Sequence, residues 1–261
     1  GDIDLGVVGP VRTGKSTFIK KFMELMVIPN INEEDRLRAV DELPQSSGGK
    51  TITTTEPKFV PDEAVEVQFA DQNFTMRVRL VDCVGYTVDS ALGYLDERGE
   101  RLVMSPWADE EIPFQEAAEI GTKKVIADHS TLGIIVTTDA SFSELAREDF
   151  EIPEARIVDE LKAIGKPFVI ILNSSQPEAS STLQLQTELA EKYRAPVIPC
   201  NCLRLDRKSV DAILKEALYE FPVNQINIIL PDWVEALAED HWLKCGFLDI
   251  VRGIMKGADK V

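Results

Sequence analysis

The stretch that decides the fold is residues 9–16, which read GPVRTGKS. It matches the pattern G-x-x-x-x-G-K-[S/T], in which a tight loop turns its successive backbone N–H groups toward phosphate. Gly9 and Gly14 allow backbone conformations that a side chain would forbid. In such loops the lysine, here Lys15, reaches the β- and γ-phosphates, and the hydroxyl, here that of Ser16, binds Mg²⁺. The stretch therefore predicts a site for a nucleotide phosphate chain.

The surroundings of this loop favour the same interpretation. Residues 2–8 form an apolar run typical of a strand, and residues 14–27 carry apolar side chains at helical spacing. A strand before the loop and a helix after it separate a phosphate loop from a glycine-rich turn, which is the alternative. The predicted nucleotide contacts in this region are Gly9, Pro10, Val11, Arg12, Thr13, Gly14, Lys15, Ser16 and Thr17.

Composition excludes several classes of function. The 261 residues hold 45 acidic and 28 basic side chains, a formal net charge of −17. Sequence-blind binding of nucleic acid needs clustered cations, so no nucleic-acid partner is expected. The two histidines lie far apart and the four cysteines do not match zinc spacing, which argues against a Ser-His or Cys-His hydrolase and against a zinc site. A metal here would be a hard cation such as Mg²⁺, held by oxygens.

The chain shows no membrane or export signal. No apolar run approaches the roughly 18 residues that a spanning helix needs. The first residues lack the basic and apolar regions of a secretory signal. A cytoplasmic location is therefore predicted.

The rest of the chain alternates apolar runs with helical patterns. A hairpin is indicated by residues 66–70 and 75–82 around a polar turn. Buried strands are predicted at residues 132–137, 167–172 and 196–199, and helices at 115–128, 154–164, 180–193 and 209–219. Continuous apolar strands between helices are typical of parallel sheets. The prediction is an α/β P-loop NTPase fold, with a mostly parallel central sheet covered by helices on both faces.

Two parts of the chain are expected. Residues 1–221 are predicted to form the P-loop NTPase domain, and residues 222–261 a C-terminal extension that packs on it or leads to a missing middle domain. A strand is predicted at residues 225–230. Because the terminal helix has no evident stop, the chain is interpreted as a piece of a longer protein. Residues 86–113 show no clear period, which favours a nucleotide-responsive loop.

Two further segments complete the predicted site. Residues 80–85 read LVDCVG, in which Asp82 ends an apolar strand and Gly85 follows three residues later. Asp82 is predicted to hold the Mg²⁺ water shell and Gly85 to bring its N–H to the γ-phosphate; the alternative is a strand-capping aspartate. Residues 50–57 read KTITTTEP. Thr54 or Thr55 is favoured to complete the metal shell and sense the γ-phosphate, the alternative being an edge strand.

In their order, these features resemble the translation-factor-like P-loop GTPases over residues 5–219. That family reads guanine with N-K-x-D after a buried strand, but residues 173–176 here are NSSQ, and the later S-A-K is replaced by CNC at residues 200–202. A pocket without the aspartate should not prefer guanine, whereas amide and backbone groups suit adenine. The nucleotide contacts that the resemblance implies here are Asn173, Ser174 and Cys202.

Four stretches narrow the resemblance: GVVGPVRTGKSTFIKKFMEL, GGKTITTTEPKFVP, LVDCVGY and FVIILNSS. Together they resemble the spore coat ATPases of the stage IV sporulation protein A family. The resemblance implies Mg²⁺-dependent hydrolysis of ATP to ADP and phosphate, which drives self-assembly of the coat basement layer. It implies a location in the mother-cell cytoplasm at the forespore outer membrane. The implied partners are ATP, further copies of the protein, a small amphipathic recruiting peptide and other coat proteins.

The general chemistry of phosphoryl transfer predicts roles for residues of these motifs. The catalytic set is Lys15, Arg12, Thr54, Thr55 and Asp82, and the metal set is Ser16, Thr54, Thr55 and Asp82. Arg12 is either a built-in arginine finger or a solvent-facing arginine paired with acids. Related GTPases place a water-orienting glutamine where Tyr86 stands, so slow intrinsic turnover is predicted. Two other functions stay open: a GTPase with a degenerate base reader, and a structural module that binds nucleotide without turnover.

Overall fold

A six-stranded sheet organises the first of two units into which the chain divides, Gly1–Ala217 and Leu218–Val261. The structure is a computed structural model of the 261-residue chain. It describes residues 2–41, 43, 58–68, 75–88, 95–96, 99–105, 107–108, 110–223 and 229–255.

The sheet has the strand order β10-β9-β8-β1-β3-β2, and only the edge strand β2 runs antiparallel to its neighbour. Its strands are β1 (Asp2–Val8), β2 (Lys58–Gln68), β3 (Thr75–Asp82), β8 (Leu132–Thr138), β9 (Phe168–Asn173) and β10 (Val197–Cys200). Every residue of β8 and β9 is buried, as strands covered on both faces require. The register sets Val7 beside Asp82, and Thr138 beside Asn173. Asp82 and Asn173, both predicted site residues, therefore lie at the carboxyl ends of their strands, on the same side of the sheet.

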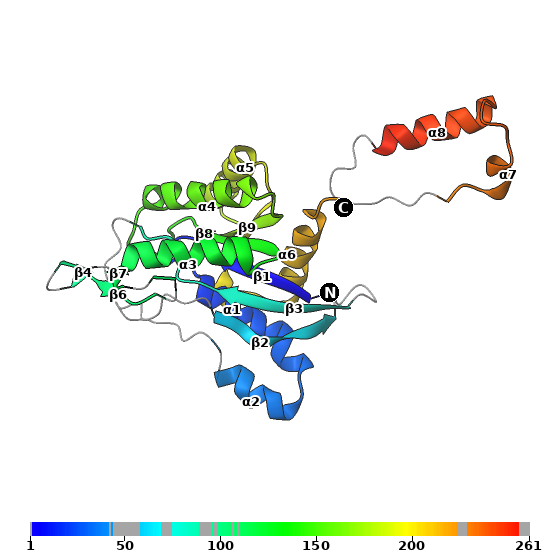
Figure 1. Ribbon diagram of the computed structural model, residues 1–261. Coiled ribbons are helices and arrows are strands. Elements are labelled where there is room, and N and C mark those ends of the chain that lie inside the picture. The colour runs from blue at the N-terminus through cyan, green and yellow to red at the C-terminus, as the bar shows by residue number, and fades with distance from the viewer. Residues whose placement is uncertain are drawn as a thin grey trace. The chain divides into compact units, whose positions relative to one another are not determined.

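Helices cover both faces of this sheet (Figure 1). Their bounds are α1 (Lys15–Phe22), α2 (Glu33–Asp41), α3 (Phe114–Asp128), α4 (Glu151–Ala163), α5 (Ser180–Tyr193) and α6 (Arg207–Tyr219). Apolar side chains of α3, α4 and α5 pack with Val81, Ile135 and Ile170 into one buried cluster. Helix α1 packs on β1 and β3, and its Phe18 and Ile19 are fully buried. The predicted α/β fold with a mostly parallel sheet is confirmed.

Several predicted bounds shift. The helix predicted at residues 14–27 is α1 followed by a π-helical turn, η1 (Met23–Val27), and a 3₁₀ turn, η2 (Ile28–Asn30). Strand β2 begins at Lys58 instead of residue 66. The sequence pattern missed its first part because Pro61, Asp62 and Glu63 interrupt the alternation at the register shift between Val60 and Val65. Helix α4 begins three residues earlier than predicted, after the 3₁₀ turn η3 (Arg147–Phe150). The strand predicted at residues 225–230 lies mostly outside the described residues.

The unpatterned segment at residues 86–113 contains short strand pairs in its described part. β4 (Leu95–Asp96) pairs with β5 (Gly99–Glu100), and β6 (Leu102–Val103) pairs with β7 (Ile112–Pro113). The 3₁₀ turn η4 (Cys202–Arg204) follows β10. In the second unit, α7 (Asp232–Glu235) precedes α8 (Trp242–Met255). Over the described part of the chain, every helix is too short or too polar to cross a bilayer.

Candidate functional site

Two glycines of the loop between β1 and α1, Gly9 and Gly14, stand where no side chain would fit. Gly9 has φ 151°, and a Cβ there would lie 2.2 Å from the carbonyl oxygen of Val136. Gly14 has φ 102°, and a Cβ there would lie 2.3 Å from Nδ2 of Asn173. Gly14 is also the left-handed cap from which α1 starts, so the free N–H groups of the first helical turn adjoin the loop. This backbone is the cradle that an anion needs.

Lys15 lies inside the loop. The residue is 6% exposed, and Nζ donates a 2.8 Å hydrogen bond to the carbonyl oxygen of Pro10. Thr13 Oγ1 donates to the same carbonyl at 2.9 Å. Burial lowers the pKa of Lys15, while nearby Cys83 and Asp82 act in the opposite direction. The loop thus holds a partly desolvated cation, and a phosphate chain would supply the charge that it lacks.

Asp82 ends β3 with one oxygen unsatisfied. Its Oδ1 atom is buried and has no hydrogen-bond partner among the described residues. Burial raises the pKa of Asp82 to about 6, and the attraction of Lys15 offsets this only in part. An unpaired buried acceptor is costly unless a cation or an ordered water completes it.

The donors present at this point fit Mg²⁺. That ion is usually held by one or two carboxylates together with phosphate oxygens and waters. Asp82 offers the carboxylate, and Ser16, in the first turn of α1, offers a partly accessible hydroxyl. Within the described ranges, no group of three or more His, Cys, Asp or Glu side chains could hold a metal by itself. A metal at Asp82 would therefore depend on oxygens of the nucleotide.

The segment after Asp82 touches the loop directly. A Cβ on Gly85, whose φ is 90°, would lie 2.1 Å from the carbonyl oxygen of Gly9 and 2.6 Å from Nζ of Lys15. The backbone N–H of Val11 donates to the carbonyl of Tyr86 at 2.9 Å. The two motifs, separated by more than sixty residues in sequence, therefore form one site.

Asn173, the residue that remains of the base-reading motif, ties two loops together. Its Nδ2 donates to the carbonyl of Thr13 at 2.9 Å, and its Oδ1 accepts the N–H of Cys202 at 3.0 Å. Ser174 Oγ accepts the N–H of Gln176 at 3.0 Å and lies 3.3 Å from the Thr182 hydroxyl. These contacts organise the edge of the sheet beside the phosphate loop. Direct contact of Asn173, Ser174 or Cys202 with a nucleotide stays a prediction.

The remaining predicted residues are placed as follows. Arg12 is exposed and has a left-handed backbone, φ 64°. Pro10 and Val11 are buried, and Thr17 is partly buried in the first turn of α1. Thr54 and Thr55 lie outside the described residues.

A buried charge network behind the site was not expected from the sequence. Glu154 on α4 has no exposed surface and accepts hydrogen bonds from Arg147, Thr137 and Tyr193. One pattern in the sequence could have indicated that Glu154 is buried. This acidic residue shares a helix face with the apolar residues three, four and seven positions later. The network fixes the turn that carries Phe150, and Phe150 packs against Val11 of the phosphate loop.

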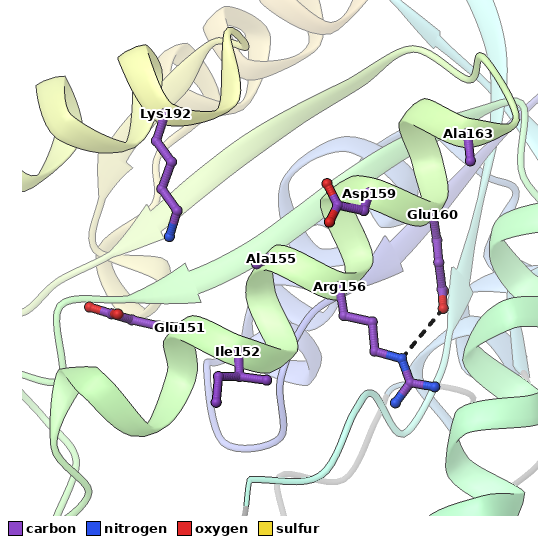
Figure 2. Close-up of a pocket in the computed structure, with 8 residues that line it drawn as sticks. All are labelled: Glu151, Ile152, Ala155, Arg156, Asp159, Glu160, Ala163 and Lys192. Atoms are coloured by element: carbon purple, nitrogen blue, oxygen red, sulfur yellow. Dashed lines mark ion pairs between the residues drawn. The ribbon is translucent and has the colours of Figure 1, made fainter.

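Two hollows on the surface of the described residues lie apart from the phosphate loop. The larger one, about 680 Å³, is an open groove along α4 bounded by Lys192 of α5 (Figure 2). A second, about 220 Å³, is lined by residues that include Tyr86 and Arg156. No phosphate-loop residue lines either hollow. The candidate site is defined by backbone geometry and charge.

The parallel sheet, the glycine loop before α1, the buried Lys15 and the adjoining Asp82 define a P-loop NTPase domain. A family model described as "Stage IV sporulation protein A, ATPase domain" matches residues 1–222, and the model of that family's middle domain matches residues 223–261. The chain belongs to the Stage IV sporulation protein A family.

Three relatives bear the name Stage IV sporulation protein A. Those of Bacillus subtilis (strain 168) and Bacillus anthracis are 54% and 55% identical to this chain over 257 residues, 98% of its length. The relative from Clostridioides difficile (strain 630) is 50% identical over 253 residues, 97% of the chain. The chain spans about half the length of each, 52%, 52% and 51% respectively. The resemblance to this family seen in the sequence is confirmed.

Proposed function

We propose that the chain binds ATP with Mg²⁺ and hydrolyses it to ADP and phosphate, and that hydrolysis drives self-assembly of the spore coat basement layer. One observation carries the proposal: the buried Lys15, the unsatisfied Oδ1 of Asp82 and the backbone of Gly85 converge at the glycine loop. The ATPase-domain description of the matching family supports the same reading.

Catalysis rests mostly on positioning and charge. Lys15 and the loop N–H groups would neutralise the phosphate chain, and Gly85 would direct its N–H at the transferred phosphate. Ser16 and Asp82 would hold Mg²⁺, which neutralises charge developing on the phosphate oxygens. Thr54 or Thr55 would complete this set. Because Tyr86 replaces the usual water-orienting glutamine, we expect slow turnover unless another group or a second copy contributes.

Arg12 is proposed to act as a built-in arginine finger. It stands in the phosphate loop and is an exposed residue on a left-handed backbone. A guanidinium in the phosphate loop can bind a phosphate chain and stabilise the charge of the transition state. The competing role is an ordinary surface ion pair, worth little energetically.

Base choice is proposed to follow from the altered loops. Residues 173–176 lack the carboxylate that would pair with the two donors of guanine, and the amide of Asn173 already bonds Thr13 and Cys202. Adenine, with one donor and ring acceptors on its edge, suits amide and backbone groups. Asn173, Ser174 and Cys202 are proposed to shape this pocket.

The cellular role is a proposal as well. Residues 1–221 are proposed as the ATPase domain, and residues 222–261 as part of the middle domain, whose family model matches residues 223–261. The partners are proposed to be further copies of the protein, a small amphipathic recruiting peptide and other coat proteins. The site of action is proposed to be the mother-cell side of the forespore outer membrane.

Phosphate release from ATP tests the enzymatic part. Wild-type chain and a Lys15→Ala variant are compared with Mg²⁺ and with excess chelator. The proposal expects release that needs both Lys15 and Mg²⁺. Tight ATP binding without multiple turnovers would instead favour a structural module that uses nucleotide as a folding cofactor.

A further inference from the structure

Tyr86 is joined to the phosphate loop by its main chain. Its carbonyl accepts the N–H of Val11 at 2.9 Å, and it directly follows Gly85, which packs on Gly9 and Lys15. A movement of Tyr86 would therefore move the N–H of Gly85 relative to the loop.

The side chain of Tyr86 leads away from the loop to a different anchor. The residue is 2% exposed, and its hydroxyl donates a hydrogen bond to the carboxylate of Glu160 on α4. The guanidinium of Arg156, one helical turn earlier, lies 4.7 Å from the centre of the ring. Burial is the largest cause that raises the pKa of Tyr86 well above its ordinary value, and the bond to Glu160 is the next. The hydroxyl therefore stays protonated, and so a donor, at any physiological pH.

The anchor is itself braced between two helices. Arg156 makes paired hydrogen bonds of 2.9 and 2.8 Å to Glu119 on α3, and its Nε lies 3.6 Å from Glu160. Lys123, also on α3, lies 3.9 Å from Glu160. Figure 2 shows Arg156 and Glu160 extending side by side from α4, joined by their ion pair. The acceptor for the Tyr86 hydroxyl is thus held in place independently of the loop.

We propose that Tyr86 is a positioning residue for hydrolysis, whose hydroxyl bond to Glu160 keeps Gly85 aligned with the phosphate loop. The inference rests on the proposed ATPase function. In this role Tyr86 does not orient the attacking water. It holds the backbone of Gly85 in place through its bond to Glu160. Tyr86 is fixed at its carbonyl and at its hydroxyl, so the neighbouring N–H of Gly85 is in place before the transition state forms. Such preorganisation contributes to turnover more than to substrate binding.

Tyr86→Phe tests the bond with little change of shape. The ring and its contact with Arg156 remain, and only the hydroxyl is lost. We expect kcat for ATP to fall on the order of tenfold while KM changes less than about twofold, because misplacement of a transition-state donor acts on kcat.

Tyr193→Phe is the matched control. Its hydroxyl also donates to a glutamate on α4, Glu154, at 2.8 Å, but no hydrogen bond joins Tyr193 to the phosphate loop or to Gly85. Both variants lose one hydroxyl–carboxylate bond, which is partly buried at Tyr86 and buried at Tyr193, so Tyr193→Phe should lose at least as much stability as Tyr86→Phe. Tyr193→Phe should lower kcat much less than Tyr86→Phe, because Arg147 still holds Glu154 and with it the turn that carries Phe150.

Changes at Glu160 keep the test decisive if Tyr86→Phe folds poorly. Glu160→Gln retains an oxygen acceptor and should keep kcat within about threefold of wild type, whereas Glu160→Ala should match Tyr86→Phe. The double variant Tyr86→Phe/Glu160→Ala should be no slower than either single variant, because both remove the same bond.

The outcomes separate the two proposals. Equal kcat in Tyr86→Phe and Tyr193→Phe, a rise in KM with kcat unchanged, or additive losses in the double variant would each overturn the positioning role while the ATPase stands. Wild-type turnover that does not depend on Lys15 would overturn the ATPase proposal and the positioning role with it.

Discussion

Replacing Asp82 by Asn should separate the cost of this residue to the fold from its value to the reaction. The change keeps the shape and removes the charge. Because Oδ1 of Asp82 is buried and has no hydrogen-bond partner in the described part of the chain, the charged carboxylate destabilises the protein when no ligand is bound. We expect Asp82→Asn to stabilise the nucleotide-free fold at neutral pH and to abolish Mg²⁺-dependent turnover.

The magnitude follows from the pKa. Burial raises the pKa of Asp82 from 3.8 to about 6, net of the attraction of Lys15. At about 1.4 kcal/mol for each pKa unit, the charge costs the native state at most about 3 kcal/mol at pH 7. The asparagine N–H groups also need partners there, so we expect a net gain of about 1–2 kcal/mol.

The pH dependence has a definite sign. The folded state keeps the Asp82 proton up to about pH 6, whereas the unfolded chain loses it near 3.8. Between these values the folded state binds more protons, so this residue makes the protein less stable as the pH rises. The advantage of Asp82→Asn should be absent below about pH 4 and complete above about pH 7.

Urea unfolding measures the difference in stability between Asp82→Asn and wild type. It is carried out without nucleotide or Mg²⁺ at several pH values between about 4 and about 8. Asp62→Asn removes an exposed carboxylate and controls for the change in net charge. An Asp82→Asn variant that is less stable than wild type at pH 7.5, or equally stable across this range, would refute burial as the dominant influence on Asp82.

Three further predictions concern the loop and its support. Gly9→Ala places a Cβ 2.2 Å from the Val136 carbonyl, so thermal unfolding should show a loss of at least about 2 kcal/mol; an unchanged melting temperature would contradict the crowding. Arg147→Ala leaves the buried Glu154 charge with neutral partners only, and denaturant unfolding should show a loss of about 3 kcal/mol, which conservation of stability would disprove. Arg12→Ala should lower ATP turnover at least about tenfold with little change in ATP affinity, measured by titration; equal losses in both would defeat the finger role.

The sheet and the phosphate loop were predictable because local patterns encode them. Continuous apolar runs mark β8 and β9, and residues 9–16 carry their own loop geometry. The bounds of β2 were less accessible, since polar residues inside the strand hide its period.

Long-range contacts of the site could not be predicted in this way. Asn173 meets the carbonyl of Thr13 across 160 positions, and Tyr86 meets Glu160 across 74. The sequence around each residue does not indicate its hydrogen-bond partner, because the two residues meet only when the strand ends and the helices pack. The amide of Asn173 therefore looked like a base contact alone, and its bonds to Thr13 and Cys202 emerged only from the fold.

The most direct measurement is phosphate release from ATP and from GTP, side by side, for wild type and Lys15→Ala. We predict Lys15-dependent turnover of ATP with GTP near background, as expected of a phosphate loop whose base reader has lost its carboxylate. Comparable rates with both nucleotides would show that the altered loops do not select adenine. Absence of Lys15-dependent release with either nucleotide would contradict the assignment of the glycine loop as a hydrolytic site.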